Sequence, residues 1–180
     1  CTAVVSGDDN LIDLVELSLV GNTLRVGTRQ NVNFTSHNLI KVALTSPTME
    51  AVHQSGSGDV QLRGLRQNGL QVVMQGSGDL DLSGQVRDLQ LTLQGSGDMD
   101  AVIDSASKIS VDLHGSGDVS ISGRTDLCVL RLTGSGDIQA QSLKAAVANI
   151  DLLGSGDIDA FASDEAQVRL FGNGDISVRG

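Results

Sequence analysis

The tetrapeptide Gly-Ser-Gly-Asp recurs through most of this chain at a nearly constant interval. It begins at Gly56, Gly76, Gly95, Gly115, Gly134 and Gly154, and a GNGD variant begins at Gly172. Successive starts are 20, 19, 20, 19, 20 and 18 residues apart. Flexible Gly-Ser linkers keep no such interval, so the run predicts a corner that a repeated structural unit uses once per turn.

Strand-like patterns flank each corner. Leu91 and Leu93 stand four and two residues before Gly95, while Met99 and Ala101 follow its aspartate. The other units repeat these apolar positions, with mostly polar residues between them. Alternation with a period of two predicts β-strands with one buried face. The units gain or lose residues in the variable connection between corners.

Units of this length cannot bury an apolar face alone and must stack on their neighbours. We therefore expect an all-β fold, a parallel β-solenoid (β-helix) with coils of about 20 residues. Residues 1–48 lack the regular corner and are expected to form less regular β coils that open the solenoid. Residues 49–180 are expected to form the regular β-helix, within one structural domain overall.

The glycines of the corners are the predicted structural turn residues. Glycine adopts positive φ angles without strain, and its missing Cβ lets successive corners stack closely. They are Gly56, Gly58, Gly76, Gly78, Gly95, Gly97, Gly115, Gly117, Gly134, Gly136, Gly154, Gly156, Gly172 and Gly174.

Each corner also carries an aspartate, and stacking places these carboxylates in one column. The column comprises Asp59, Asp79, Asp98, Asp118, Asp137, Asp157 and Asp175. Repulsion between neighbours must be offset by hydrogen bonds from corner N–H groups, as in an Asx-turn, or by weakly bound cations such as Ca²⁺. We favour the structural role, because calcium-binding β-rolls use a Gly-Asp corner about every 9 residues. No other cofactor is expected.

The composition and net charge disfavour some classes of binding partner. The net charge of −10 disfavours nucleic acid and anionic membranes. No run approaches the ~18 apolar residues of a transmembrane helix, and no signal peptide is visible. Cys128 lies in an apolar strand-like run and is expected in the core, whereas Cys1 is either a lipid-carrying mature N-terminus or a trimmed end.

Catalysis is not expected from these residues. The carboxylates repeat uniformly, His37, His53 and His114 are scattered, and neither a nucleophile elbow nor a phosphate loop is present. Carbohydrate binding usually exploits aromatic side chains, and only Phe34, Phe161 and Phe171 are available. Phe171 and Leu153 form an exposed apolar patch or, as we favour, pack under a neighbour.

The two ends of the chain both read as half-coils. Unpaired strand edges favour association, so we expect self-association end to end or as a dimer. The predicted interface residues are Cys1, Val4, Val5, Ile176 and Val178.

The repeated "SGSGD", together with "GDDNL", "NTLRV" and "TSPTMEAVHQSGSGD", resembles the head GIN domain family of bacterial envelope proteins. The resemblance implies a right-handed parallel β-helix in an exported, adhesin-type protein. The location would be periplasmic, outer-membrane-associated or extracellular.

Three functions remain open from the sequence. The first is a non-enzymatic adhesion or scaffold module, which binds a surface glycan or protein without turnover. The second is a structural subunit that polymerises into fibres, and the third is a β-helical enzyme acting on polysaccharides. A cleft with clustered carboxylates and arginine on adjacent coils would favour the enzyme.

Overall fold

A computed structural model describes residues 2–6, 15–28, 41–46 and 48–180 of the chain. All regular secondary structure in these residues is β-strand. The chain divides into two compact units, residues 1–48 and residues 49–180.

The N-terminal unit contains β1 (Thr2–Ser6), β2 (Val15–Val20), β3 (Thr23–Thr28) and β4 (Lys41–Thr45). Strand β1 pairs antiparallel with β4, and β2 pairs antiparallel with β3. Gly21, with φ 61°, and Asn22 form the turn between β2 and β3, and so short a connection permits only antiparallel pairing. The described strands are thus antiparallel pairs, where we expected coils. That this segment opens the solenoid stays a prediction.

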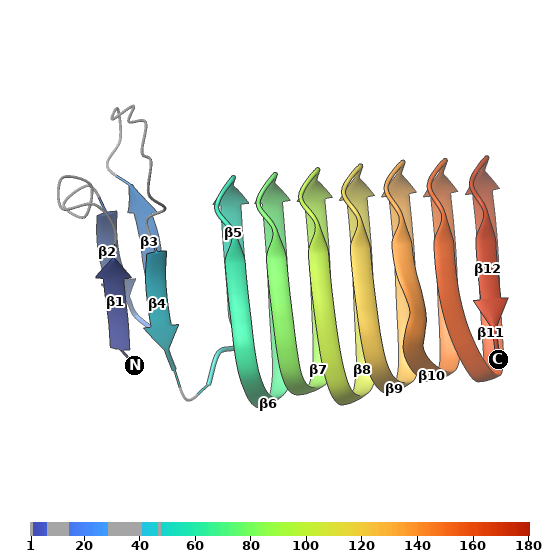
Figure 1. Cartoon of the computed structure of the whole chain (residues 1–180), viewed down its shortest axis with the longest axis horizontal. Helices are drawn as coiled ribbons and strands as arrows, with labels where there is room; N and C mark the ends of the chain where they lie inside the picture. The colour runs from blue at the N-terminus through green and yellow to red at the C-terminus, as the bar shows by residue number, and fades with distance from the viewer. Residues whose placement is uncertain (1, 7–14, 29–40, 47) are drawn as a thin grey trace. The chain divides into compact units, whose positions relative to one another are not determined.

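The C-terminal unit is a parallel β-solenoid of about seven coils (Figure 1). Its eight strands lie in sequence order, each hydrogen-bonded to the next, and all the pairs are parallel. The strands are β5 (Ala51–Gly56), β6 (Val60–Gly76), β7 (Leu80–Gly95), β8 (Met99–Gly115), β9 (Val119–Gly134), β10 (Ile138–Gly154), β11 (Ile158–Gly172) and β12 (Ile176–Arg179). The expected all-β solenoid is confirmed, while its right-handed sense stays a prediction.

The GxGD corners keep the coils in register. The first glycine of each corner pairs with the first glycine of the next, from Gly56 and Gly76 through to Gly154 and Gly172. The register shifts fall in the variable connection, for example between Leu62 and Leu65 of β6. The differences in unit length are therefore absorbed away from the GxGD corner.

The interior of the solenoid consists of aliphatic ladders. Leu93, Leu113 and Leu132 occupy one ladder and are at most 1% exposed. Cys128 is 2% exposed and packs in this interior, as expected. The ladders end at β11, where Val168 and Leu170 are each 46% exposed because β12 pairs only with residues 158–161.

Candidate functional site

The two glycines of each corner serve different purposes. The first has a positive φ, from 106° at Gly56 to 156° at Gly154, which L side chains rarely adopt. The second has an ordinary φ, but a Cβ on Gly97 would collide with the carbonyl oxygen of Gly78 one coil earlier. Gly58, in the first corner, has only the Gln54 amide nitrogen within 4 Å of an added Cβ, at 3.9 Å. Stacking therefore demands the second glycine only where a preceding corner lies beneath it.

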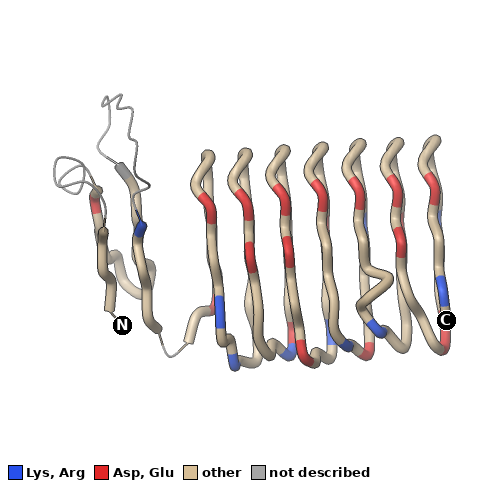
Figure 2. The backbone as a smooth tube through the Cα atoms, in the orientation of Figure 1, with Lys and Arg blue, Asp and Glu red and all other residues tan. Residues whose placement is uncertain are grey.

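The corner aspartates form a hydrogen-bonded rail along the solenoid. The backbone N–H of each aspartate donates to Oδ1 of the aspartate one coil earlier, at 2.9–3.1 Å. These bonds join six successive pairs, from Asp59 and Asp79 to Asp157 and Asp175. Figure 2 shows the acidic residues recurring at one level of successive coils. We name this column the aspartate rail.

The rail corrects one detail of the sequence analysis. We expected each carboxylate to bond amides of its own corner, whereas Oδ1 accepts from the next coil. Because an N–H dipole faces each carboxylate from Asp59 to Asp157, these bonds offset part of the repulsion within the column. No group of three or more His, Cys, Asp or Glu side chains is placed to hold a metal within the described ranges. Weak cation binding along the rail stays a prediction.

A second charged ladder crosses an outer face of the solenoid. Arg131 lies 3.5 Å from Asp112 Oδ1 and 3.7 Å from Asp151 Oδ2, and Arg169 lies 3.6 Å from Asp151 Oδ1. Charges of opposite sign thus alternate over four coils. This arrangement stabilises stacking and leaves no unpaired group for chemistry.

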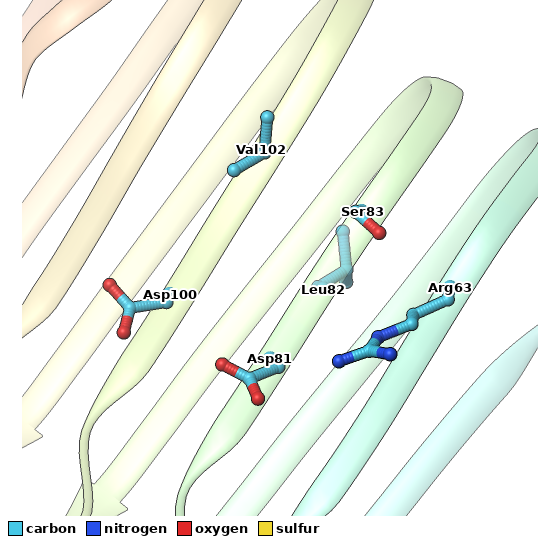
Figure 3. A pocket seen from close by; sticks show the side chains of 6 residues that line it. All are labelled: Arg63, Asp81, Leu82, Ser83, Asp100 and Val102. Carbon is cyan, nitrogen blue, oxygen red and sulfur yellow. The ribbon is translucent and has the colours of Figure 1, made fainter.

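A hollow of about 220 Å³ opens on the outside of coils β6 to β8 (Figure 3). Its lining residues are Arg63 from β6, Asp81, Leu82 and Ser83 from β7, and Asp100 and Val102 from β8. In Figure 3 the two carboxylates project side by side, and the Arg63 guanidinium extends toward Asp81. We name this feature the side hollow.

The charges of the side hollow are only partly satisfied within the described chain. Asp81 and Asp100 are register partners on neighbouring strands, so their backbones lie about 4.8 Å apart. Oδ2 of Asp81 accepts a hydrogen bond from Gln61 Nε2 at 3.1 Å. No ion pair of Arg63 and no hydrogen bond of the Asp100 side chain is found among the described residues. Val102, 55% exposed, adds an apolar patch to this polar surface.

The other candidate residues do not converge on a site. His53 and His114 are exposed on different coils, while His37 and Phe34 lie outside the described residues. Nζ of Lys144 lies 3.8 Å from the ring centroid of Phe161. Leu153 and Phe171 are register partners and are 53% and 65% exposed, so they form an exposed patch instead of packing under a neighbour.

The predicted interface residues are partly accessible at the surface of their own units. Val4 is 56% exposed and Val178 36%, while Val5 and Ile176 are half-buried. Cys1 lies outside the described residues. Residues 162–172 of β11 have a partner strand on the β10 side only, within the part of the chain that the structure describes.

Sequence reasoning missed the side hollow. The available signal was an apolar residue, Val102, in an outward-facing position beside two acidic ones. Asp81 and Asp100 share the second position after the corner aspartate, which predicted their adjacency in principle. Arg63 could not be added, because it lies within the register shift between Leu62 and Leu65, where the repeat does not define which residue of the next coil it adjoins.

Comparison with protein families gives a match along both halves of the chain. A family described as "Putative auto-transporter adhesin, head GIN domain" matches residues 2–102 and 84–180. A search of curated proteins found no match. No helix within the described ranges is long and apolar enough to cross a membrane.

Three solved structures share the fold. A putative lipid binding protein from Parabacteroides distasonis is 24% identical, with a TM-score of 0.80 over 99% of this chain and 84% of that one. A putative adhesin from Bacteroides fragilis is 23% identical, with a TM-score of 0.80 over 98% and 81%. A second P. distasonis protein, also a putative adhesin, is 22% identical, with a TM-score of 0.81 over 98% and 83%.

Proposed function

Because the chain belongs to the head GIN domain family of putative auto-transporter adhesins, we propose that it is a non-enzymatic adhesion or scaffold module. In this proposal the protein is exported and acts in the periplasm, at the outer membrane or outside the cell. Its partner is a surface glycan or protein, which it binds without turnover.

The observation that carries this proposal is the continuity of the solenoid. Neighbouring coils are connected by the paired corner glycines and by the aspartate rail. Four of the coils are also connected by the ion pairs of Asp112, Arg131, Asp151 and Arg169. A stack held in register in this way presents fixed rows of side chains, which suits repeated contacts with an extended partner. Many weak contacts along one rigid surface add up to firm attachment.

The side hollow has the carboxylates and arginine that we took as the mark of a polysaccharide-acting enzyme. Binding is nevertheless the better account of it. Glycosidases place a general acid in a desolvated environment that keeps it protonated, whereas Asp81 and Asp100 are both exposed. A polysaccharide substrate also needs a cleft that holds several rings, and about 220 Å³ is below the usual 300–1,000 Å³ of ligand pockets.

The experiment is co-sedimentation of the 180-residue chain with bacterial envelope fragments over a range of protein concentrations. Saturable binding that survives washing is expected. The variant Gly97→Ala, in which the corner cannot stack, is expected to lose binding, and Gly58→Ala is the matched control that keeps it. Binding that never saturates, or that is equal for both variants, would contradict the proposal.

Self-association is a second candidate, supported by the edge of β11. Within the part of the chain that the structure describes, residues 162–172 have a partner strand on the β10 side only, and Val168 and Leu170 are exposed beside them. Open strand edges of this kind favour pairing with another strand. Light scattering coupled to size-exclusion chromatography is expected to show a mass that grows with concentration. A monomer at every concentration, or a growth that Val168→Lys leaves unchanged, would exclude association through this edge.

A further inference from the structure

We propose that the side hollow binds a small zwitterion, a primary ammonium group a few ångströms from an oxyanion, as in phosphoethanolamine. The inference rests on the proposed function and names a ligand class for the adhesion module. The same chemistry is available from a water-soluble or glycan-borne phosphoethanolamine group and from a lipid headgroup.

The charges of the side hollow suit a ligand that carries a cation. The two carboxylates belong to Asp81 and Asp100, register partners on neighbouring strands whose backbones are about 4.8 Å apart, and the described outward neighbour of Asp100 on β9 is the neutral Ser120. Two anions at this distance favour a cation between them. A primary ammonium group donates up to three hydrogen bonds and can serve both carboxylates at once.

Arg63 supplies the opposite charge on the other side of the hollow. Its guanidinium extends toward Asp81 in Figure 3, yet no ion pair within 4.0 Å is formed with it. A planar guanidinium binds phosphate or carboxylate oxygens through paired N–H groups. Its presence also disfavours a bare metal ion at the carboxylates, because the two cations would repel.

The spacing of the coils limits the distance between the two charged groups of the ligand. Arg63, Asp81 and Asp100 lie on three successive coils, so their backbones span two strand spacings, about 10 Å, along the solenoid. An ammonium group between Asp81 and Asp100 and an oxyanion at Arg63 are therefore less than two spacings apart in that direction, and the link between them must be short. The two-carbon link of phosphoethanolamine is short enough, and Val102 lines the same hollow as an apolar neighbour.

The volume fits such a ligand. A hollow of about 220 Å³ is smaller than the usual 300–1,000 Å³ of ligand pockets, which suits one compact molecule better than a polymer chain. Ser83, also in the lining, offers a hydroxyl that can donate to the oxyanion.

The test is a titration of the isotope-labelled 180-residue chain, followed by its backbone amide resonances. The probe is O-phosphoethanolamine. Phosphocholine is the matched control, because it has the same phosphate but a quaternary ammonium that cannot donate a hydrogen bond. Ethanolamine and inorganic phosphate test each charge alone. We expect saturable shifts confined to β6, β7 and β8, with at least about tenfold weaker binding of each control.

Three variants sharpen the test. Asp100→Asn and Arg63→Gln are each expected to weaken binding of O-phosphoethanolamine about tenfold. Asp159→Asn changes the same position of the repeat in a coil outside the hollow and is expected to leave it unchanged. Equal binding of phosphocholine, shifts scattered over all coils, or equal binding by Asp100→Asn and Asp159→Asn would overturn the proposal.

Vesicles separate the two sources of the ligand. If the source is a lipid, vesicles of phosphatidylcholine with phosphatidylethanolamine retain the chain, and vesicles of phosphatidylcholine alone do not. If neither retains it while soluble O-phosphoethanolamine binds, the source is water-soluble or glycan-borne. Envelope binding that persists without any phosphoethanolamine binding would overturn the ligand but not the adhesion module.

Discussion

The backbone N–H of Asp98 donates a hydrogen bond of 3.0 Å to the Oδ1 atom of Asp79, one coil earlier. Asp98 in turn accepts the N–H of Asp118 at the same distance. The carboxylates of Asp79 and Asp98 repel each other, and each faces the backbone N–H dipole of the next coil. These hydrogen bonds offset part of the repulsion. The bonds of the rail join residues 18 to 20 positions apart, so the interval between corners in the sequence is matched by contacts between neighbouring coils.

The rail predicts a position-dependent cost of removing an aspartate. Asp98→Ala leaves the Asp118 N–H without its acceptor and is expected to lower the free energy of unfolding by about 1–2 kcal/mol. Asp98→Asn keeps an acceptor oxygen and is expected to cost less than half as much. Asp175→Ala is the control, because no N–H within the described residues donates to that carboxylate. Urea titration measures all three, and an equal loss in Asp98→Ala and Asp175→Ala would contradict a structural rail.

The rail also predicts the response to calcium. Each carboxylate except that of Asp175 already accepts an N–H, so we expect the unfolding midpoint in millimolar calcium to match that in chelator. A site with a dissociation constant one hundredth of the calcium concentration would add about 2.7 kcal/mol. A rise of that size, abolished by Asp98→Asn, would show that the rail is a cation site after all.

The second glycine of the corner gives a sharp steric prediction. In Gly97→Ala the new Cβ would collide with the Gly78 carbonyl. Backbone hydrogen bonds from Ser96 N–H to Gly76 O and from Leu80 N–H to Asp98 O hold the two corners together on either side of this contact. We expect a loss of about 3 kcal/mol or more in unfolding free energy. Gly58→Ala, with open space around its Cβ, is expected to change stability by less than about 1 kcal/mol. Circular dichroism during denaturation compares the two, and similar stabilities would refute the stacked corner.

The outer ion ladder predicts a salt-dependent contribution. Arg131 contacts Asp112 and Asp151 while its side chain is 55% exposed, so Arg131→Gln is expected to cost only about 0.5–1 kcal/mol at low salt. Near 1 M salt the Debye length falls to about 3 Å and the cost is expected to approach zero. Arg66→Gln, an exposed arginine without an ion pair among the described residues, controls for loss of charge. A cost that salt leaves unchanged would point to packing of the Arg131 stem instead.

The buried thiol predicts a loss of stability in alkali. Burial raises the pKa of Cys128 from 9.0 to about 12. The thiol stays protonated in the folded state, whereas the unfolded chain releases the proton above pH 9. Its contribution is therefore complete below pH 9 and is lost as the pH rises toward 12, by up to about 1.4 kcal/mol per pH unit. The variant Cys128→Ala removes this slope, and equal slopes in both proteins between pH 9 and 11 would contradict the burial.

The sequence predicted the solenoid because its strongest signals are periodic. The constant interval, for example from Gly76 to Gly95, predicts that equivalent residues stack on neighbouring coils. The alternation around Leu91 and Leu93 predicts which side chains face the interior. The burial of Cys128 followed from the same alternation. The exposure of Val168 did not follow from the alternation. Val168 occupies an apolar ladder position, but the described part of β12 pairs only with residues 158–161 and leaves it exposed.

Features that depend on spatial neighbours were harder to predict. An aspartate can bond its own corner or the next coil, and nothing in GSGD distinguishes the two. The Gly21–Asn22 turn carried a hairpin signal, but the regular corners favoured continuing the coils into residues 1–48. The side hollow combines Arg63 with Asp100 across two coils and a register shift, a relationship that only the folded chain defines.

Binding of envelope material by this chain without chemical change is best measured by following protein and glycan in one sample. The chain is incubated with envelope fragments and, separately, with an acidic polysaccharide. The bound fraction and the length of the glycan chains are then measured over the same hours. We expect saturable retention with unchanged glycan length. A steady fall in length that Asp100→Asn abolishes would contradict it and make the side hollow an active site.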